Sequence, residues 1–407
     1  MSTSARHTRL VLATTLAFAF TASRLMAEEP ASPSPKQNET LISRAVQSME
    51  SVRAVALPGV AESGSIATQC EPAPPDKDMR EWFLAPIPMA NATLGAGLAL
   101  GAGYFFKPDA DDEVSPPSLI GAGAFYFDSE SSGVGVGTML NLREDRIRVV
   151  GAALKATLRY GLFAGDKEDA HGVPIRQTVD GLLLSGLYRV HGDLFLGGRV
   201  YYSNVVTDLD SGEAEDVGID PEELDSSIGA FGAIASYDNR DSQFFPLHGT
   251  KSELRADMNS SAMGSDFSYK RYELDTRWYH AVRERDVFAW QAYGCATAGK
   301  TPFYAQCQYG AGGTPRGYSV GRHFDETMLV AQAEYRWVVR PRWIVAAFGS
   351  IGGVAPQLGE IRGDALLAAG GGGIRWVVAP KNKLSLRVDY AVGEDDSGVY
   401  IAVGEAF

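Results

Sequence analysis

Hydrophobic and polar residues alternate along most of the chain from about residue 82 onward. In the segment 267–281, tyrosine, leucine, threonine and tryptophan take every second position, and arginine, glutamate and aspartate stand between them. Segments 148–160, 328–338 and 384–392 repeat this alternation, which predicts β-strands with one apolar and one charged face. Several of these runs are 11 to 15 residues long, whereas soluble strands usually have about 5 or 6 residues. The lengths favour strands that cross a membrane.

The pattern predicts an all-β fold made of a long succession of strands. Candidate strands cover residues 94–106, 118–127, 133–142, 147–160, 178–190, 193–203, 226–237, 250–260, 267–281, 286–298, 327–339, 342–354, 368–379, 384–393 and 398–407. These are fifteen, whereas bacterial single-chain barrels normally have an even number. We therefore expect one more strand within residues 82–92 and predict a transmembrane antiparallel β-barrel of sixteen strands. A soluble β-sandwich, whose strands also alternate, is the competing fold.

The first 27 residues have the composition of an export signal. Arg6 and Arg9 precede an apolar run over residues 10–22, and small residues up to Ala27 suit cleavage there. The apolar run is too short to span a bilayer, and no later stretch reaches the roughly 18 to 20 apolar residues that a membrane helix needs. Residues 1–27 are thus predicted to be a signal peptide.

Residues 28–81 are rich in proline, serine and alanine, which is typical of a linker. Apolar residues recur at helical spacing after Asn38, so this predicted periplasmic linker can contain one short helix. The remaining residues, 82–407, form the predicted barrel domain.

Composition narrows the functional classes. The formal net charge is −13 and no basic cluster occurs, which argues against a nucleic-acid partner because binding phosphates requires a basic face. The 6 histidines are scattered, and none stands at metal-ligand spacing with another histidine or cysteine. No paired nucleophile and base is apparent. We expect neither a catalytic site, nor a metal, nor a cofactor.

A glycine-rich stretch at 310–318, with the sequence GAGGTPRGY, separates two of the long strand segments. It lacks the lysine and serine or threonine of a phosphate-binding loop, and no strand-to-helix unit surrounds it. The alternative is an extracellular barrel loop that enters the lumen and carries an arginine there. The residues of this loop motif are Gly312, Gly313, Arg316, Gly317 and Tyr318.

A second motif follows the strand segment 226–237. It contains Asp238, Arg240 and Asp241, and then Pro246 and Gly249. Aspartate, proline and glycine are ordinary turn formers, so a plain turn explains these residues on their own.

Together, the turn motif and the Arg-Gly-Tyr loop resemble, in order and separation, two motifs of the BamA/TamA outer-membrane family, also called the bacterial surface antigen family. The resemblance covers roughly residues 90–407. It implies a barrel in the outer membrane of a Gram-negative bacterium that assists the assembly of outer-membrane proteins or lipids. It also implies a seam between the first and last strands that can loosen. Its partners would be outer-membrane lipids, the barrel assembly machinery during biogenesis, and client proteins.

Residues 28–81 are too few and too rich in proline for the POTRA modules that precede the barrel in family insertases. A passive pore, in which lumen charges set selectivity, is therefore kept as the alternative function.

The resemblance also implies a partner for Arg316. The family often has an aspartate in the strand after the loop, where this chain has Ser350. A hydroxyl accepts a weaker hydrogen bond from arginine than a carboxylate does. Glu334 and Asp389, on expected lumen-facing positions, are the other candidate partners.

The last residues put Val403 and Phe407 on one expected lipid-facing side of the final strand, interrupted by Glu405. A terminal aromatic residue on such a strand resembles the signal that the assembly machinery reads. A plain edge strand is the alternative interpretation.

Cys295 and Cys307 bracket the start of the long loop that contains the glycine-rich stretch. In an oxidising compartment their separation of 12 residues permits a disulfide.

Overall fold

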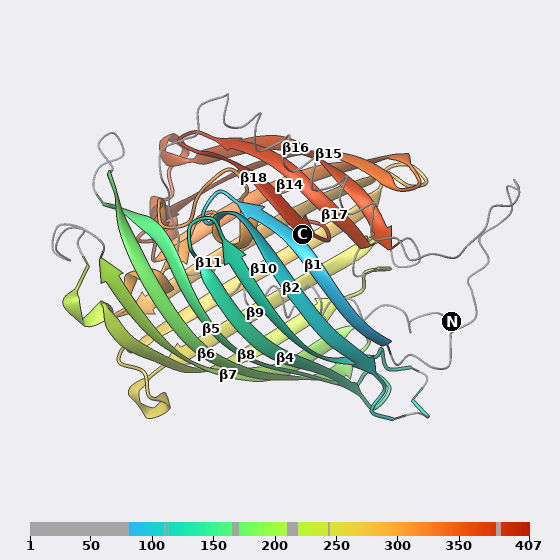
Figure 1. Cartoon of the computed structure of the whole chain (residues 1–407), viewed down its shortest axis with the longest axis horizontal. Helices are drawn as coiled ribbons and strands as arrows, with labels where there is room; N and C mark the ends of the chain where they lie inside the picture. Colours follow the sequence, from blue (N-terminus) through green and yellow to red (C-terminus); the bar gives the residue numbers. More distant parts are fainter. Residues whose placement is uncertain are drawn as a thin grey trace, which may run out of the picture. The chain divides into compact units, whose positions relative to one another are not determined.

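A computed structural model describes residues 81–109, 111–112, 114–164, 171–209, 219–242, 245–379 and 384–407. In this part of the chain, sixteen antiparallel strands close into a barrel in which β1 and β18 are neighbours (Figure 1). The barrel strands are β1 (Glu81–Asn91), β2 (Gly95–Phe106), β3 (Ser118–Phe127), β4 (Ser132–Leu142), β5 (Ile147–Ala164), β6 (His171–His191), β7 (Leu194–Leu209), β8 (Asp225–Asp238), β9 (Gly249–Asn259), β10 (Tyr269–Ala281), β11 (Val287–Gly299), β14 (Thr327–Arg340), β15 (Trp343–Ala355), β16 (Leu367–Ala379), β17 (Leu384–Gly393) and β18 (Ser397–Val403).

The predicted count of sixteen strands is confirmed, and the strand that was absent from the fifteen candidates is β1. A separate two-stranded sheet pairs β12 (Cys307–Gln308) with β13 (Phe324–Asp325). Short 3-10 helices occur in the connections: η3 (Pro221–Glu223), η4 (Ser261–Met263), η5 (Phe303–Ala305), η6 (Ala311–Gly313), η7 (Leu358–Glu360) and η8 (Gly363–Ala365). None of the helices in the described residues is long and apolar enough to cross a membrane.

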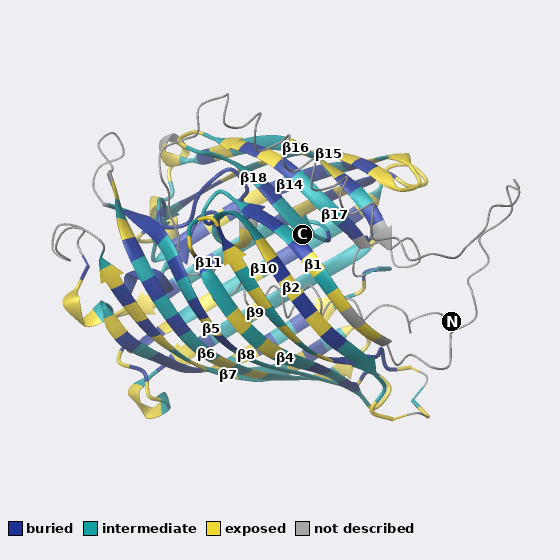
Figure 2. Ribbon diagram, viewed as in Figure 1, coloured by how far each residue is buried: buried dark blue, intermediate teal, exposed yellow. Residues whose placement is uncertain are grey.

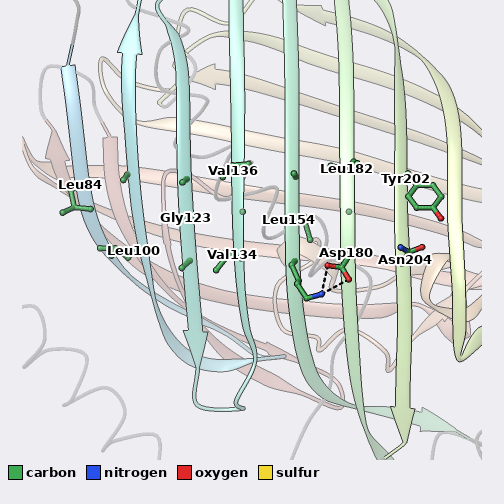
Figure 3. A pocket seen from close by; sticks show the side chains of 17 residues that line it. Leu84, Leu100, Gly123, Val134, Val136, Leu154, Asp180, Leu182, Tyr202 and Asn204 are labelled. Carbon is green, nitrogen blue, oxygen red and sulfur yellow. Dashed lines mark hydrogen bonds and ion pairs between the residues drawn. The ribbon is translucent and has the colours of Figure 1, made fainter.

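Alternation along the strands sorts the side chains between the outer face and the lumen. On β10, Tyr272 and Leu274 are 44% and 46% exposed on the outer face. The alternate residues Glu273 and Asp275 each form an ion pair with an arginine inside the barrel. Figure 2 shows exposed positions alternating with less exposed ones along β2, β4 and β6. Most charged residues of the strands thus avoid lipid, where each would be costly to place. An exception is the ion pair of Lys155 with Asp180 (3.0 Å), which lies on the outer face beside the exposed residues Val134 and Leu182 (Figure 3).

We define the terminal end of the barrel as the end at which β1 begins and β18 ends, and the loop end as the opposite one. All 6 tryptophans of the chain lie at outward positions near strand boundaries at the terminal end. They are Trp82, Trp278, Trp290, Trp337, Trp343 and Trp376. Tryptophan gathers at membrane–water interfaces because its ring is apolar and its N–H is polar, so this row marks one edge of the membrane-spanning band.

Strands β5 and β6 are longer than the pattern predicted. Their paired residues run from Ile147 with Tyr188 to Ala164 with His171. Beyond the predicted ends, Leu162 and Ile175 are buried on the inner side, where they join an apolar cluster with residues of the loop between β11 and β14. This hairpin therefore continues because its inner face has something to pack against.

Candidate functional site

The connection between β11 and β14, residues 300–326, lies inside the barrel at its loop end. The Tyr304 hydroxyl is 2.5 Å from Ser226 Oγ on β8, and the Tyr309 hydroxyl donates to the backbone oxygen of Leu367 at the start of β16 (2.8 Å). Since β8 and β16 are far apart around the barrel, the connection crosses the lumen. We call it the lumen loop.

Arg316 is the most deeply enclosed charge of the lumen loop, with a side chain that is 1% exposed. Its Nη2 donates to Glu334 Oε2 on β14 (2.7 Å), and its Nη1 donates to Asp389 on β17. The guanidinium lies over the Phe348 ring of β15, 3.4 Å from the ring centroid. Two carboxylates and one aromatic face, from three strands, hold the arginine.

Ser350, the third candidate partner, does not bind the arginine. It lies on β15 two residues beyond Phe348, and among the described residues no hydrogen bond joins it to Arg316. Of the three candidate partners, Glu334 and Asp389 thus bind Arg316 and Ser350 does not. β15 contributes a ring to the site, while the charge comes from Glu334 and Asp389 on other strands.

Two further arginines share these carboxylates. Arg375 on β16 donates through Nη2 to Glu334 Oε2 (3.0 Å) and through Nη1 to Asp389. Arg336 on β14 donates through Nε to Glu334 Oε1 (2.7 Å). The side chains of all four network residues other than Arg316 are fully buried. In an apolar surrounding this is stabilising only because each charge is paired and hydrogen-bonded.

Sequence reasoning had not selected Arg336 and Arg375. Arg336 could have been found from the alternation of side chains along a strand. It stands two residues after Glu334 on the same strand, so both side chains must face the lumen. The position of Arg375 beside Asp389 depends on the β16–β17 register, which pairs Gly373 with Asp389 and Arg375 with Arg387.

The glycines of the motif let the loop backbone pass close to the wall. Gly317 has φ +103°, and a Cβ there would lie 3.0 Å from the Ala369 Cβ and 3.1 Å from the Gly393 nitrogen. Its own nitrogen donates to the Tyr400 hydroxyl of β18 (2.8 Å). Gly312 and Gly313 belong to the short helix η6.

Tyr318 and Ser319 fasten the same segment to the turns at the loop end. The Tyr318 hydroxyl donates to the Ala368 oxygen (2.6 Å), and the Ser319 nitrogen donates to Asp396 Oδ2 (2.7 Å). Burial raises the pKa of the Asp396 carboxyl above its usual range, although both of its backbone contacts oppose that rise. Asp396, like Glu334 and Asp389, is thus a carboxylate that binds the lumen loop and is partly removed from water.

The start of the lumen loop is tied to the barrel wall by a covalent bond. Cys295 on β11 and Cys307 on β12 form a disulfide with a Cα–Cα distance of 5.8 Å. The bond closes the 12-residue separation between the end of a membrane strand and the small β12–β13 sheet. It therefore limits how far the first part of the loop can move.

The turn motif connects β8 to β9 at the terminal end. Asp238 and Arg240 form an ion pair in which Arg240 Nε donates to Asp238 Oδ1 (2.8 Å), and Asp241 Oδ1 accepts from the backbone nitrogen of Leu247 (3.0 Å). Pro246 is buried, and at Gly249 a Cβ would lie 2.6 Å from the Asn239 oxygen. These contacts hold the two ends of the β8–β9 connection close together.

The terminal residue lies elsewhere than expected. Val399, Ile401 and Val403 do alternate along β18, but the strand ends at Val403. Phe407 is 4% exposed inside the barrel, so its expected place on the lipid-facing side was wrong. The cause is a turn at Gly404, which has φ +87°.

The seam between β1 and β18 is weakly paired. Only Ala90 and Ile401 face each other in register, whereas every residue from Glu81 to Asn91 is paired with β2. The barrel is closed, yet its first and last strands are joined at one point.

The sequence of β1 explains part of this. The Ala96 oxygen of β2 accepts from the Asp128 nitrogen beyond β3 (2.8 Å), so even-numbered residues of β2 turn their backbone groups to β3. Because backbone groups alternate in direction along a strand, the β1–β2 register directs the even-numbered residues of β1 to the seam. Pro86 and Pro88 are among these, and proline has no N–H to donate.

No arrangement for binding a metal occurs in the described ranges: no group of three or more His, Cys, Asp or Glu side chains is placed to hold an ion.

Comparison with known proteins agrees with this geometry. A family model described as the Omp85 superfamily domain matches residues 196–407. No curated protein sequence matches at a significant level.

Many solved structures match in fold, and three of them are described. BamA from Haemophilus ducreyi, lacking POTRA domains 1-3, is similar with a TM-score of 0.56 and 13% identity over 80% of this chain and 70% of that one. CdiB from Acinetobacter baumannii has a TM-score of 0.54 and 11% identity over 80% of this chain and 60% of that one. CdiB from Escherichia coli has a TM-score of 0.52 and 11% identity over 78% of this chain and 61% of that one. The chain thus spans less than two thirds of either CdiB chain, and at these identities the similarity shows the fold alone.

Proposed function

The chain belongs to the Omp85 superfamily, and on that premise we propose that it is an outer-membrane barrel that assists the insertion of outer-membrane proteins or lipids through its seam. The observation that carries the proposal is the single residue pair between β1 and β18. Breaking a backbone hydrogen bond between strands in lipid costs much free energy, because the freed groups find no water. Separating two strands joined by one residue pair therefore costs much less free energy than separating two fully paired strands.

The lumen loop supports the same proposal. Gly317 binds Tyr400 of β18, and the nitrogen of Val320 donates to Thr93 Oγ1 in the β1–β2 turn (3.1 Å). The loop therefore contacts both sides of the seam from within. These contacts keep the two strands near each other although few bonds join them directly.

The test locks the seam. Ala90→Cys with Ile401→Cys places two thiols on facing residues, whose expected Cα separation of about 5.5 Å suits a disulfide. After reconstitution in vesicles, the unlocked barrel should accelerate the folding of an unfolded client barrel relative to empty vesicles. The oxidised variant should lose this acceleration, and reductant should restore it.

A matched control carries Ala122→Cys with Val136→Cys, which are paired in the continuous β3–β4 ladder. This lock should leave client folding unchanged. Wild-type protein treated with the same reductant accounts for the native disulfide. The proposal is wrong if the seam-locked barrel remains as active as the unlocked one, or if neither exceeds empty vesicles.

A passive pore is the second candidate, favoured by the glycine-rich inner wall of β3. Gly121 and Gly123 point into the lumen, and a Cβ added to either would meet only backbone atoms of β2, the nearest at 3.0 Å and 3.5 Å. The lumen beside this wall is therefore open, while the opposite wall carries the charged clusters. A passage of this kind would conduct ions.

A further inference from the structure

A row of three polar residues lies on the outer face of the barrel, where β5, β6 and β7 run side by side. Lys155 on β5 is paired in register with Asp180 on β6, and Asp180 is paired with Asn204 on β7. Residues paired in this way share one face of a sheet, and Val134, which is paired with Lys155, is 58% exposed on the outer face. We call Lys155, Asp180 and Asn204 the polar row. It borders lipid, so a ligand for it comes from the membrane.

The polar row lies near the loop-end edge of the membrane-spanning band. Lys155 stands eight residues after Ile147, the first residue of β5 at the terminal end. This is a rise of about 26 Å along the strand, which a tilt of about 35–45° reduces to about 20 Å across an apolar band that is about 25 Å tall. The next outward residues of β5 toward the loop end, Thr157 and Arg159, are polar. Lipid headgroups therefore lie within reach of these side chains, since a lysine extends its charge toward the interface.

An apolar groove of about 820 Å³, whose lining includes the polar row, extends from it toward the terminal end (Figure 3). Its other outward residues form the adjacent row of paired positions, which runs from Leu182 on β6 through Ala153, Val136, Ala122 and Ala102 to Leu84 on β1. The alanines keep the floor low between the leucines at its two ends. With about 4.8 Å between strands, this row is about 24 Å long, whereas one leaflet contributes about 15 Å of hydrocarbon. The groove is therefore long enough for the acyl chains of a lipid.

The polar row offers one cation, one anion and one amide to a headgroup. The Lys155 ammonium contacts both oxygens of Asp180, at 3.0 Å and 3.1 Å, and the two side chains are 65% and 45% exposed. The Asn204 Oδ1 accepts from Ser227 Oγ on β8 (2.8 Å), while its amide nitrogen has no hydrogen bond within the described part of the chain. Charges of both signs and a donor are thus accessible from the lipid.

Stability does not account for the ion pair in the polar row. An exposed ion pair contributes little to folding, and charges on the outer face are costly near the apolar band. The outward positions beside the pair on the same two strands, Ala153 and Leu182, are apolar, as a lipid-facing wall requires. Two opposite charges in this place suit a ligand that itself carries both.

We propose that the polar row and the groove bind one phospholipid whose headgroup carries a phosphate and a primary ammonium. The phosphate binds the Lys155 ammonium, the headgroup ammonium donates to the Asp180 carboxylate, and the acyl chains lie in the groove. Each of the four charges then has two opposite charges as neighbours, an arrangement that neither an anionic nor an uncharged headgroup provides. The site goes beyond the proposed function, because it does not use the seam and holds for an inserting barrel and for a pore alike.

The test measures lipid binding to the full chain by native mass spectrometry, with one lipid at a time added to the detergent-solubilised barrel. The probes have identical acyl chains and are phosphatidylethanolamine, phosphatidylcholine and phosphatidylglycerol, which carry a primary ammonium, a trimethylated ammonium and no ammonium beside the phosphate. The native barrel should bind phosphatidylethanolamine about fivefold more tightly than either of the others, the effect of one partly exposed charge-assisted hydrogen bond.

Substitutions separate the two charges of the pair. Asp180→Asn should abolish the preference over phosphatidylcholine and shift it toward phosphatidylglycerol, because only the lysine charge remains. Lys155→Gln should weaken the binding of phosphatidylethanolamine by about fivefold, because the phosphate loses its charged partner. Since the rest of the lipid-facing surface is the same in all proteins, the difference from the native barrel reports this site.

Two controls locate the effect. Lys270→Gln removes an exposed lysine from the loop end of β10, outside this groove, where it is paired with the outward residue Met258. This variant should leave all three affinities unchanged. Ala122→Phe raises the floor of the groove and should weaken all three lipids alike, because the acyl chains and not the headgroup lose their place.

Folding of each variant is checked by the heat-dependent shift of its band on a gel. Because Lys155→Gln and Asp180→Asn each remove one charge, either folded variant decides. The proposal is refuted if the native barrel binds the three lipids equally, if phosphatidylglycerol binds most tightly, or if the folded variants keep the native preference. Client folding and conductance do not enter this readout, so failure of the proposed function would leave the lipid site standing, and the reverse.

Discussion

Replacing Arg316 with alanine tests whether the lumen loop is held by the network that surrounds it. The substitution removes two charge-assisted hydrogen bonds, to Glu334 and Asp389, and the contact with the Phe348 ring. It also leaves an unfilled space between the loop backbone and strands β14, β15 and β17. We expect the loop to loosen and the barrel to lose stability.

The magnitude follows from the remaining partners. Breaking a fully buried ion pair costs about 3 to 5 kcal/mol when one charge is left alone. Here Glu334 keeps Arg336 and Arg375, and Asp389 keeps Arg375, so neither carboxylate is abandoned. The expected loss is therefore at the lower limit, about 3 kcal/mol. Arg316→Lys should lose less, because it retains the charge but cannot bind both carboxylates with one planar group.

The assay measures unfolding by urea in lipid vesicles together with single-channel conductance in planar bilayers. Arg316→Ala should lower the urea midpoint and raise the conductance, because a released loop obstructs the lumen less. The control is Lys300→Ala in the same loop, where the exposed ammonium pairs with Glu222 (2.6 Å); an exposed ion pair contributes little to stability, so the urea midpoint should change little. An unchanged midpoint and conductance in Arg316→Ala would refute the reasoning.

Four other substitutions test the site and the lumen more narrowly. Ser350→Ala should change the free energy of unfolding by less than about 0.5 kcal/mol, as for substitutions away from key contacts. Glu334→Gln should destabilise by several-fold more in the same urea assay, because it removes the negative charge shared by three arginines and replaces one acceptor oxygen with an N–H donor. Gly123→Tyr should lower single-channel conductance without lowering the urea midpoint, since the added ring enters open lumen; Gly349→Tyr, at an outward position of β15, should leave conductance unchanged.

The barrel could be predicted from sequence because alternation and strand length are local properties. Each of the fifteen candidate segments overlaps a barrel strand, and the charged faces of segments 267–281, 328–338 and 384–392 point inward as expected. The expected faces of segment 148–160 were wrong: Leu154 and Leu158 are buried inside the barrel, where they join an apolar cluster, and Lys155 lies on the outer face. The sixteenth was obscured by Pro86 and Pro88, which break the pattern of an interior strand. Proline is tolerated at a strand edge that faces no partner, so the feature that concealed β1 also identifies it as a strand of the seam.

The site was less predictable because it depends on register and on which strands meet across the lumen. Parity correctly put Glu334 and Asp389 on the inner face, but nothing local brings residues 316, 334 and 389 together. Ser350 was chosen by analogy of position, while the arginine is met on that strand by Phe348. The alternation of Val399, Ile401 and Val403 gave no sign that Gly404 would turn the chain inward.

The lumen loop and the last residues of the chain, 404–407, are connected twice through the same buried charges. One path runs from Arg316 through Glu334 to Arg336 and the Phe407 oxygen. The other runs through Asp389 to Arg375 and Glu405.

Because neighbouring bonds in a buried polar network strengthen one another, weakening the loop contacts should also weaken the contacts of residues 404–407. The loop contacts the seam at the loop end through Tyr400, and residues 404–407 follow the end of β18 at the terminal end. A change at either end of the network therefore bears on the same pair of strands, which makes the seam, more than the lumen, the part of the barrel that these charges control.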